Sequence, residues 1–175
     1  MGVWPDTDRC EILRWHLGHS EDLEEWVTFL SLLEEQDIRG ENGLKLIIHD
    51  EASGLCSALP TVHFGAEEQR CLFLKLRSLY TAIQVPDRFS AKQEWRRRKA
   101  IFKAFRAIWQ ARRYDTVPRR YLKVVRTYRH SQPEAVATLR RDLRSTITYY
   151  RLKQPLWVWD RKHLRTTSRL ECLNR

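Results

Sequence analysis

The change of pattern near residue 75 most constrains what this chain can fold into. Before that point, strand-like and helix-like stretches alternate, with strand patterns at 11–17, 44–49 and 69–73. After it, helical patterns follow one another and are separated by prolines at positions 86, 118, 133 and 155. An alternating order of strands and helices is typical of an α/β layer. We therefore expect an α/β half followed by a helical half.

The α/β half has one central strand and two helical stretches. Leu46–Ile48 has the composition of a strand buried on both faces. A helix is expected from Ser20, its N-cap, to about Gln36, and a shorter one over 52–59. The apolar face of the longer helix consists of Leu23, Trp26, Val27, Leu30 and Leu33. The chain should turn between Gly40 and Gly43.

The helical half contains three amphipathic patterns, over 94–113, 119–129 and 134–150. Their apolar stripes predict the core positions. These positions are Ile101, Phe102, Phe105, Ile108 and Trp109, then Tyr121, Leu122, Val125 and Tyr128, then Val136, Leu139, Leu143, Ile147 and Tyr150.

Charge divides the chain in the same way. Residues 1–70 hold 5 Lys/Arg against 15 Asp/Glu, a net charge of −10, whereas residues 71–175 hold 27 against 7, a net charge of +20. Such an asymmetry favours a polyanionic partner, most often nucleic acid, over a merely solvated surface. For the run Arg96-Arg97-Arg98-Lys99 both interpretations stay open. The candidate DNA-binding residues are Arg96, Arg97, Lys99, Lys103, Arg106, Arg113 and Arg165.

Several classes of protein are not indicated. No run of about 18 apolar residues is present, so no membrane span is expected. No secretory signal is visible at the start, which favours a cytoplasmic protein. The four cysteines have no CxxC spacing, so we expect reduced, mostly buried thiols rather than a zinc site or a disulfide framework.

Two carboxylates occupy positions where chemistry is common. Asp50 follows a strand and precedes a helix, and ligands of open α/β sheets gather at such strand ends. A simple helix cap would explain the same placement. Glu171 falls in the first turn of a helix expected from about Arg169, where the helix dipole alone is sufficient to favour a carboxylate.

Three stretches in order resemble the Mutator-type transposases of bacterial insertion sequences. They are IIHDEASGLCSAL at 47–59, FGAEEQRCLFLKLR at 64–77 and HLRTTSRLECLNR at 163–175. Similar motifs in that family typically read DGxxGLxxA, QRCxxHxxRN and LRTTNxxERxNREIRRR. The resemblance covers nearly the whole chain.

The resemblance implies a ribonuclease-H-like catalytic core with an all-helical insertion. The parts would be a partial core over 1–74, the basic insertion over 75–160 and the start of the last catalytic helix over 161–175. Asp50 and Glu171 match a catalytic aspartate and glutamate that hold divalent metal, Mg²⁺ or Mn²⁺. The partners would be DNA, as transposon ends and target, and also the chain itself or an intact transposase.

Departures from the family pattern affect the expected activity. The family's first catalytic aspartate and its strand lie ahead of the segment that residues 1–17 resemble, and Asp6 and Asp8 are misplaced to substitute for it. Glu51, Leu74 and Cys172 replace the usual glycine, histidine and arginine. The expectation is a truncated, inactive transposase copy. The alternatives are a non-catalytic DNA-binding protein, a regulator of an intact transposase, or a copy that gives no stable protein.

Overall fold

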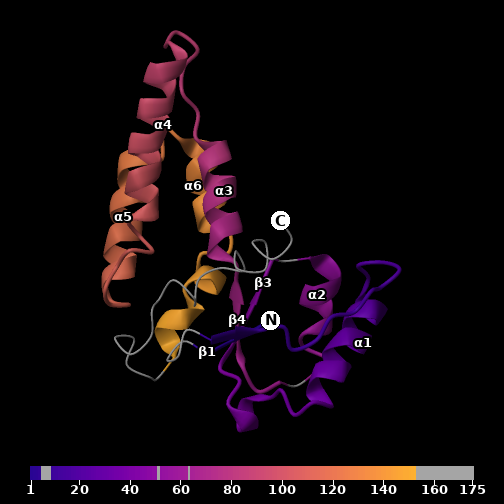
Figure 1. The fold of residues 1–175 in the computed structure, drawn as a ribbon. Helices are drawn as coiled ribbons and strands as arrows, with labels where there is room; N and C mark the ends of the chain where they lie inside the picture. Colours follow the sequence, from indigo (N-terminus) through magenta and orange to yellow (C-terminus); the bar gives the residue numbers. More distant parts are fainter. Residues whose placement is uncertain (5–8, 51, 63, 153–175) are drawn as a thin grey trace.

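The structure is a computed structural model that describes residues 1–4, 9–50, 52–62 and 64–152. This part of the chain has an α/β organisation (Figure 1). The strands are β1 (Gly2–Trp4), β2 (Arg9–Glu11), β3 (Leu46–His49) and β4 (Glu67–Arg70). The α-helices are α1 (Leu23–Glu34), α2 (Ser53–Ala58), α3 (Leu72–Ala82), α4 (Ala91–Arg106), α5 (Thr116–Tyr128) and α6 (Pro133–Arg140). Short 3₁₀ turns lie at Gly40–Asn42, Arg144–Thr146 and Thr148–Arg151.

The strands form two separate pairs. β1 pairs antiparallel with β2 in a hairpin, and β3 pairs parallel with β4 in a register that places Leu46 opposite Glu67 and His49 opposite Arg70. The parallel pair needs a crossover between its strands, and α2 lies in that crossover. The ribonuclease-H-like core remains a prediction.

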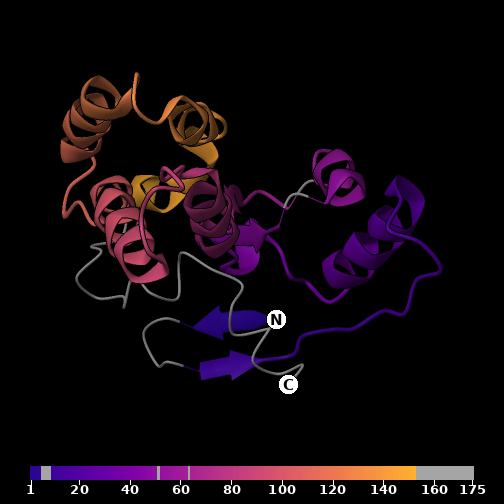
Figure 2. The same cartoon turned by 90° about the horizontal axis from the view of Figure 1, so that it is seen from above.

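Two hydrophobic clusters divide the described residues. The smaller one joins α1, α2 and the loop before β4, with Leu30, Leu55 and Phe64 buried at its centre. The larger one joins α3 to α6 and the final 3₁₀ turns. Figure 2 shows α3 to α6 grouped on one side, and α1 and α2 on the other. The predicted boundary at 74/75 falls inside α3, which belongs to the larger cluster.

In the α/β half, the structure corrects three predicted details. The strand predicted over 11–17 ends at Glu11, and Trp15 and Leu17 are exposed. Asp22, not Ser20, is the N-cap of α1, because its carboxylate accepts from the Glu25 N–H at 3.0 Å. The strand predicted over 69–73 instead spans Glu67–Arg70, with α3 starting at Leu72.

Residues 46–48 are half-buried rather than buried on both faces. Within the described part of the chain, β3 has only β4 as a strand neighbour, so the pair does not enclose its apolar side chains completely. The prediction of mostly buried thiols holds for Cys71, which is fully buried, whereas Cys56 is exposed.

In the helical half, the helix predicted over 134–150 ends at Arg140. Arg141, its C-cap, adopts an extended backbone with ψ of 125°, Asp142 follows with a left-handed φ of 57°, and two 3₁₀ turns come after them. Leu122 is 48% exposed instead of buried, and the buried side chains of α5 are Val117, Val124 and Val125. No helix in the described ranges is both long and apolar enough to cross a membrane.

Polar contacts from β4 hold the segment that follows α6. The Gln69 side chain is fully buried, and its Oε1 accepts a hydrogen bond from the Tyr149 backbone N–H at 2.8 Å. The neighbouring Arg70 guanidinium pairs with the Asp142 carboxylate at 2.8 Å. These contacts join parts of the chain that are more than 70 residues apart.

Lys75 makes a third contact of the same kind from α3. It is 1% exposed, and its Nζ donates to the backbone carbonyl of Thr138 at 2.6 Å and to that of Arg141. The last carbonyls of a helix have no partner within the helix, so the buried ammonium satisfies the end of α6. We call Gln69, Arg70 and Lys75 the anchor residues.

The buried hydrogen bond between Gln69 and Tyr149 should stabilise the fold. Gln69→Leu should lower the free energy of unfolding by about 1–3 kcal/mol, because the Tyr149 N–H would stay buried without an acceptor. Urea unfolding measures the change, with Gln110→Leu, the same substitution at an exposed position, as the matched control. Equal stability of the two variants would show that the Gln69 contact does not stabilise the fold.

Candidate nucleic-acid interface and carboxylate site

Asp50 lies at the carboxyl end of β3, one residue beyond His49, and is exposed. Its Oδ1 accepts a hydrogen bond from the Ala52 backbone N–H at 3.2 Å, which closes a short turn before α2. The N-cap of α2 is Ala52, which makes no side-chain capping bond. Asp50 therefore shapes the turn between strand and helix and does not cap α2 itself.

The described residues do not by themselves make a metal site. Among them, no three His, Cys, Asp or Glu side chains gather closely enough to hold an ion. Of the two predicted ligands they include Asp50, whereas Glu171 lies outside the described residues, as does Arg165 among the predicted DNA-binding residues. An exposed carboxylate at a strand end is a suitable oxygen ligand for Mg²⁺, but one carboxylate is too few, and we derive no reaction step from it.

The neighbour of Asp50 along the chain, His49, lies near charges of both signs. Burial is the largest cause that lowers the pKa of His49. The negative charges of Glu68 and Asp50 oppose the shift, and the positive charge of Arg70 adds to it. A histidine with a pKa below its ordinary value of about 6.5 is neutral at pH 7. The His49 Nδ1 lies 3.9 Å from the Cys56 Sγ, so the imidazole is held against α2.

A basic surface lies on the other half of the molecule, along α4. Residues advance about 100° each around a helix, which places five exposed cations within one arc of about 100°. They are Lys92, Arg96, Lys99, Lys103 and Arg106, and we call them the basic stripe. Within the described part of the chain, none of them forms an ion pair with a carboxylate.

The opposite side of α4 faces the core. Ile101, Phe102 and Phe105 pack in the larger hydrophobic cluster, as the sequence pattern predicts. Arg98 also points inward, where it pairs with Glu94 at 2.9 Å and donates to the Tyr80 carbonyl at 3.4 Å. The run of four cations at 96–99 is thus divided between two faces, and Arg98 has a structural role.

Two predicted DNA-binding residues are not part of the stripe. The Arg97 guanidinium lies 3.9 Å from the centre of the Phe89 ring, which draws it toward the loop before α4. Arg113, beyond the end of α4, pairs with Asp115 at 3.3 Å. The structure therefore brings Arg96, Lys99, Lys103 and Arg106 together, and it adds Lys92, which the sequence analysis missed although it has the same helical spacing.

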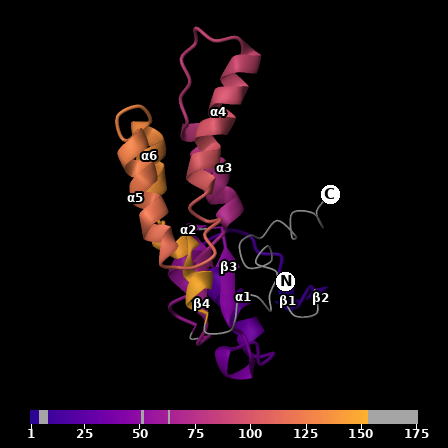
Figure 3. The ribbon, with the colours of Figure 1, turned by 90° about the vertical axis from the view of Figure 1, so that its left-hand side faces the viewer.

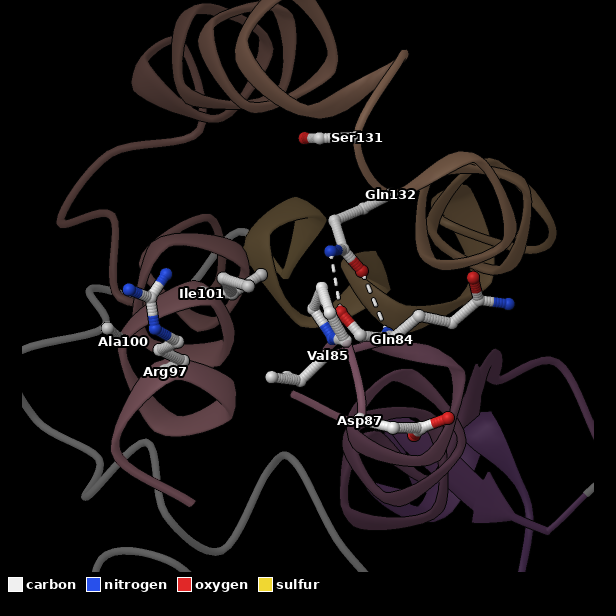
Figure 4. A pocket seen from close by; sticks show the side chains of 9 residues that line it. Gln84, Val85, Asp87, Arg97, Ala100, Ile101, Ser131 and Gln132 are labelled. Atoms are coloured by element: carbon white, nitrogen blue, oxygen red, sulfur yellow. Dashed lines mark hydrogen bonds between the residues drawn. The ribbon is translucent and has the colours of Figure 1, made fainter. Parts of the chain in front are cut away.

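A cavity of about 750 Å³ separates α4 from the turn between α5 and α6 (Figure 4). The buried Gln132 amide closes one wall by donating to the Gln84 carbonyl at 2.8 Å and accepting from the Gln84 N–H at 2.9 Å. Arg97 and Asp87 also line the cavity. The Gln132 contacts fix the beginning of the chain between α3 and α4.

Comparison with known proteins links these features to one family. The family model described as "Transposase, Mutator family" matches residues 1–175. The transposase for insertion sequence element IS256 in transposon Tn4001 from Staphylococcus aureus is 36% identical over 83 residues, which are 47% of this chain and 20% of that protein.

Two further relatives match over longer ranges. The transposase for element IST2 of Acidithiobacillus ferrooxidans is 26% identical over 85% of this chain and 46% of its own length. The transposase for element IS6120 of Mycolicibacterium smegmatis is 28% identical over 98% of this chain and 47% of its own length. The chain thus spans about half the length of these two relatives.

Two substitutions of Asp50 distinguish the hydrogen bond of its side chain from its charge. Asp50→Ala should lower the free energy of unfolding by about 1 kcal/mol, because the Ala52 N–H loses its acceptor. Asp50→Asn should stay within about 0.5 kcal/mol of the wild type, because its side-chain oxygen still accepts. Urea unfolding of both variants measures this, and equal losses would show that the charge, not the hydrogen bond, stabilises the turn.

Proposed function

We propose, from the premise that the chain belongs to the Mutator family of transposases, that its basic helical half binds the DNA on which an insertion-sequence transposase acts. The relatives are transposases of insertion sequences by name. The observation that carries the proposal is the basic stripe on α4, whose cations point to solvent and have no carboxylate partner among the described residues.

The charge around the stripe supports a polyanionic partner. Residues 87–130 hold 15 Lys/Arg and three Asp/Glu, a net charge of +12, and all of them are described. Lys and Arg side chains that neutralise phosphates release the counterions bound to DNA, which supplies sequence-independent affinity. The stripe therefore holds DNA in place without reading its sequence, which fits the transposon ends and the target DNA equally well.

Asp50 is the candidate catalytic carboxylate of the same activity. Its motif, IIHDEASGLCSAL, resembles that of the family, and its place at the end of β3 suits a ligand of Mg²⁺ or Mn²⁺. With Glu171 as the second proposed ligand, the metal would supply the activation of the attacking oxygen that such sites provide. The ribonuclease-H-like core is part of this proposal.

The DNA-binding proposal is tested by removing charge from the stripe. Lys99→Gln/Lys103→Gln should weaken binding to duplex DNA and reduce the slope of log Kobs against log salt by about 0.9 for each lost phosphate contact. The control Arg14→Gln/Lys45→Gln removes the same charge from exposed residues of the acidic half. Equal effects of both double variants, or a wild type whose binding does not depend on salt, would contradict the proposal.

The catalytic part is tested by nicking of supercoiled DNA in Mg²⁺ or Mn²⁺. Whatever nicking the wild type shows should be lost in Asp50→Asn without unfolding of the protein, because the substitution removes a metal ligand and keeps the turn. Nicking by the variant at the wild-type rate would contradict the role of Asp50. A wild type that binds DNA and does not nick it would favour the alternative of a non-catalytic DNA-binding protein or a regulator of an intact transposase.

A further inference from the structure

An exposed tryptophan flanks the basic stripe of α4. The Trp95 side chain is 53% exposed and belongs to neither hydrophobic cluster. Its helical position lies on the edge of the same arc as the five cations of the stripe, next to Arg106 and Lys99 in projection. The apolar ring therefore shares one solvent-facing surface with the cations and takes no part in the core.

The ring has a cation beside it rather than an apolar partner. The Lys99 Nζ lies 4.4 Å from the centre of the Trp95 ring, one helical turn further along α4. A cation at this distance is attracted to the π-face of an indole. The arrangement combines an aromatic face with positive charge at a single point of the surface.

Trp95 also lies near the projecting end of the helical half. The first turns of α4 and the loop before them extend beyond α5 and α6 (Figures 1 and 3). Reciprocal hydrogen bonds between Ser90 and Gln93 form a capping box that fixes the start of α4. The Arg97 guanidinium covers Phe89 in the preceding loop, so of these two aromatic rings Trp95 is the more accessible.

We propose that Trp95 stacks on an unpaired DNA base while the neighbouring cations hold the flanking phosphates. Every base has a π-face, and proteins that bind single strands combine aromatic side chains with a basic groove in this way. The consequence is that the stripe binds DNA with unpaired bases more tightly than fully paired duplex. This inference rests on the proposed DNA binding and adds a preference for the state of the DNA.

The charges argue for a nucleic-acid base and against an apolar protein surface as the occupant. Lys99 lies against Trp95, and Lys92 is one helical turn before it. An apolar partner would have to remove these cations from water without pairing them. An unpaired strand supplies both parts of the match, because each exposed base carries a phosphate on either side. The stacked face and the ion contacts can then form together.

Equilibrium binding to two DNAs of equal length and phosphate number tests the inference, one fully paired and one with a central stretch of unpaired thymines. The wild type should prefer the unpaired DNA by about tenfold. Trp95→Ala should lose that preference and keep duplex affinity within about twofold, and Trp95→Phe should retain most of it because phenylalanine also stacks. Trp15→Ala, which removes a 78% exposed tryptophan from the acidic half, should behave as the wild type.

The outcomes separate this inference from the proposal on which it rests. Salt-dependent duplex binding without any preference for unpaired DNA, or a preference that survives in Trp95→Ala, would overturn the stacking role and leave DNA binding by the stripe intact. A folded Trp95→Ala that loses duplex and unpaired binding equally would assign Trp95 to duplex contact and also overturn the inference. A wild type that binds neither DNA would refute both.

Discussion

The buried amide of Gln69 is the contact on which the arrangement of the two halves depends. It lies near the end of β4, just before the helical half, and it holds Tyr149, close to the end of the described part of that half. Lys75 donates hydrogen bonds to the carbonyl groups at the end of α6, which lies a few residues before Tyr149. Gln69 and Lys75 therefore join the start of the helical half to the segment that ends α6 and follows it, through buried polar contacts whose loss leaves groups unsatisfied.

The spacing of apolar residues correctly predicted the helices whose buried side follows a regular helical repeat. The apolar faces of α1 and α4 follow a helical repeat, and Leu30, Phe105 and Trp109 are buried as expected. The prediction from spacing was wrong where contacts with distant residues determine the secondary structure. Leu72 and Phe73 are compatible with a strand, yet Leu72 packs in the helical cluster, and the chain becomes helical there. The extended Arg141 and the left-handed Asp142, which pairs with Arg70, end the helix that the repeat would have continued to 150.

The candidate sites were predictable to different degrees. Helical spacing predicts four cations of the basic stripe. It could also have found Lys92 and Trp95, because they lie seven and four residues before Lys99 and so share its side of the helix. Spacing within α4 does not reveal that Arg97 is drawn away by Phe89, because that ring belongs to another segment. The buried roles of Gln69 and Lys75 depend on partners more than 60 residues away, so no local pattern indicates them. The role of Asp50 in a metal site stays a prediction.

Lysine acetylation of the protein alone and of its complex with duplex DNA, read by mass spectrometry, tests the central claim most directly. The claim is that DNA lies along α4 and away from the acidic half. The account predicts that DNA protects Lys92, Lys99 and Lys103 from modification and leaves the exposed Lys45 as reactive as in the free protein. Protection of Lys45 to the same extent, or unchanged reactivity of all three stripe lysines while DNA is bound, would contradict it.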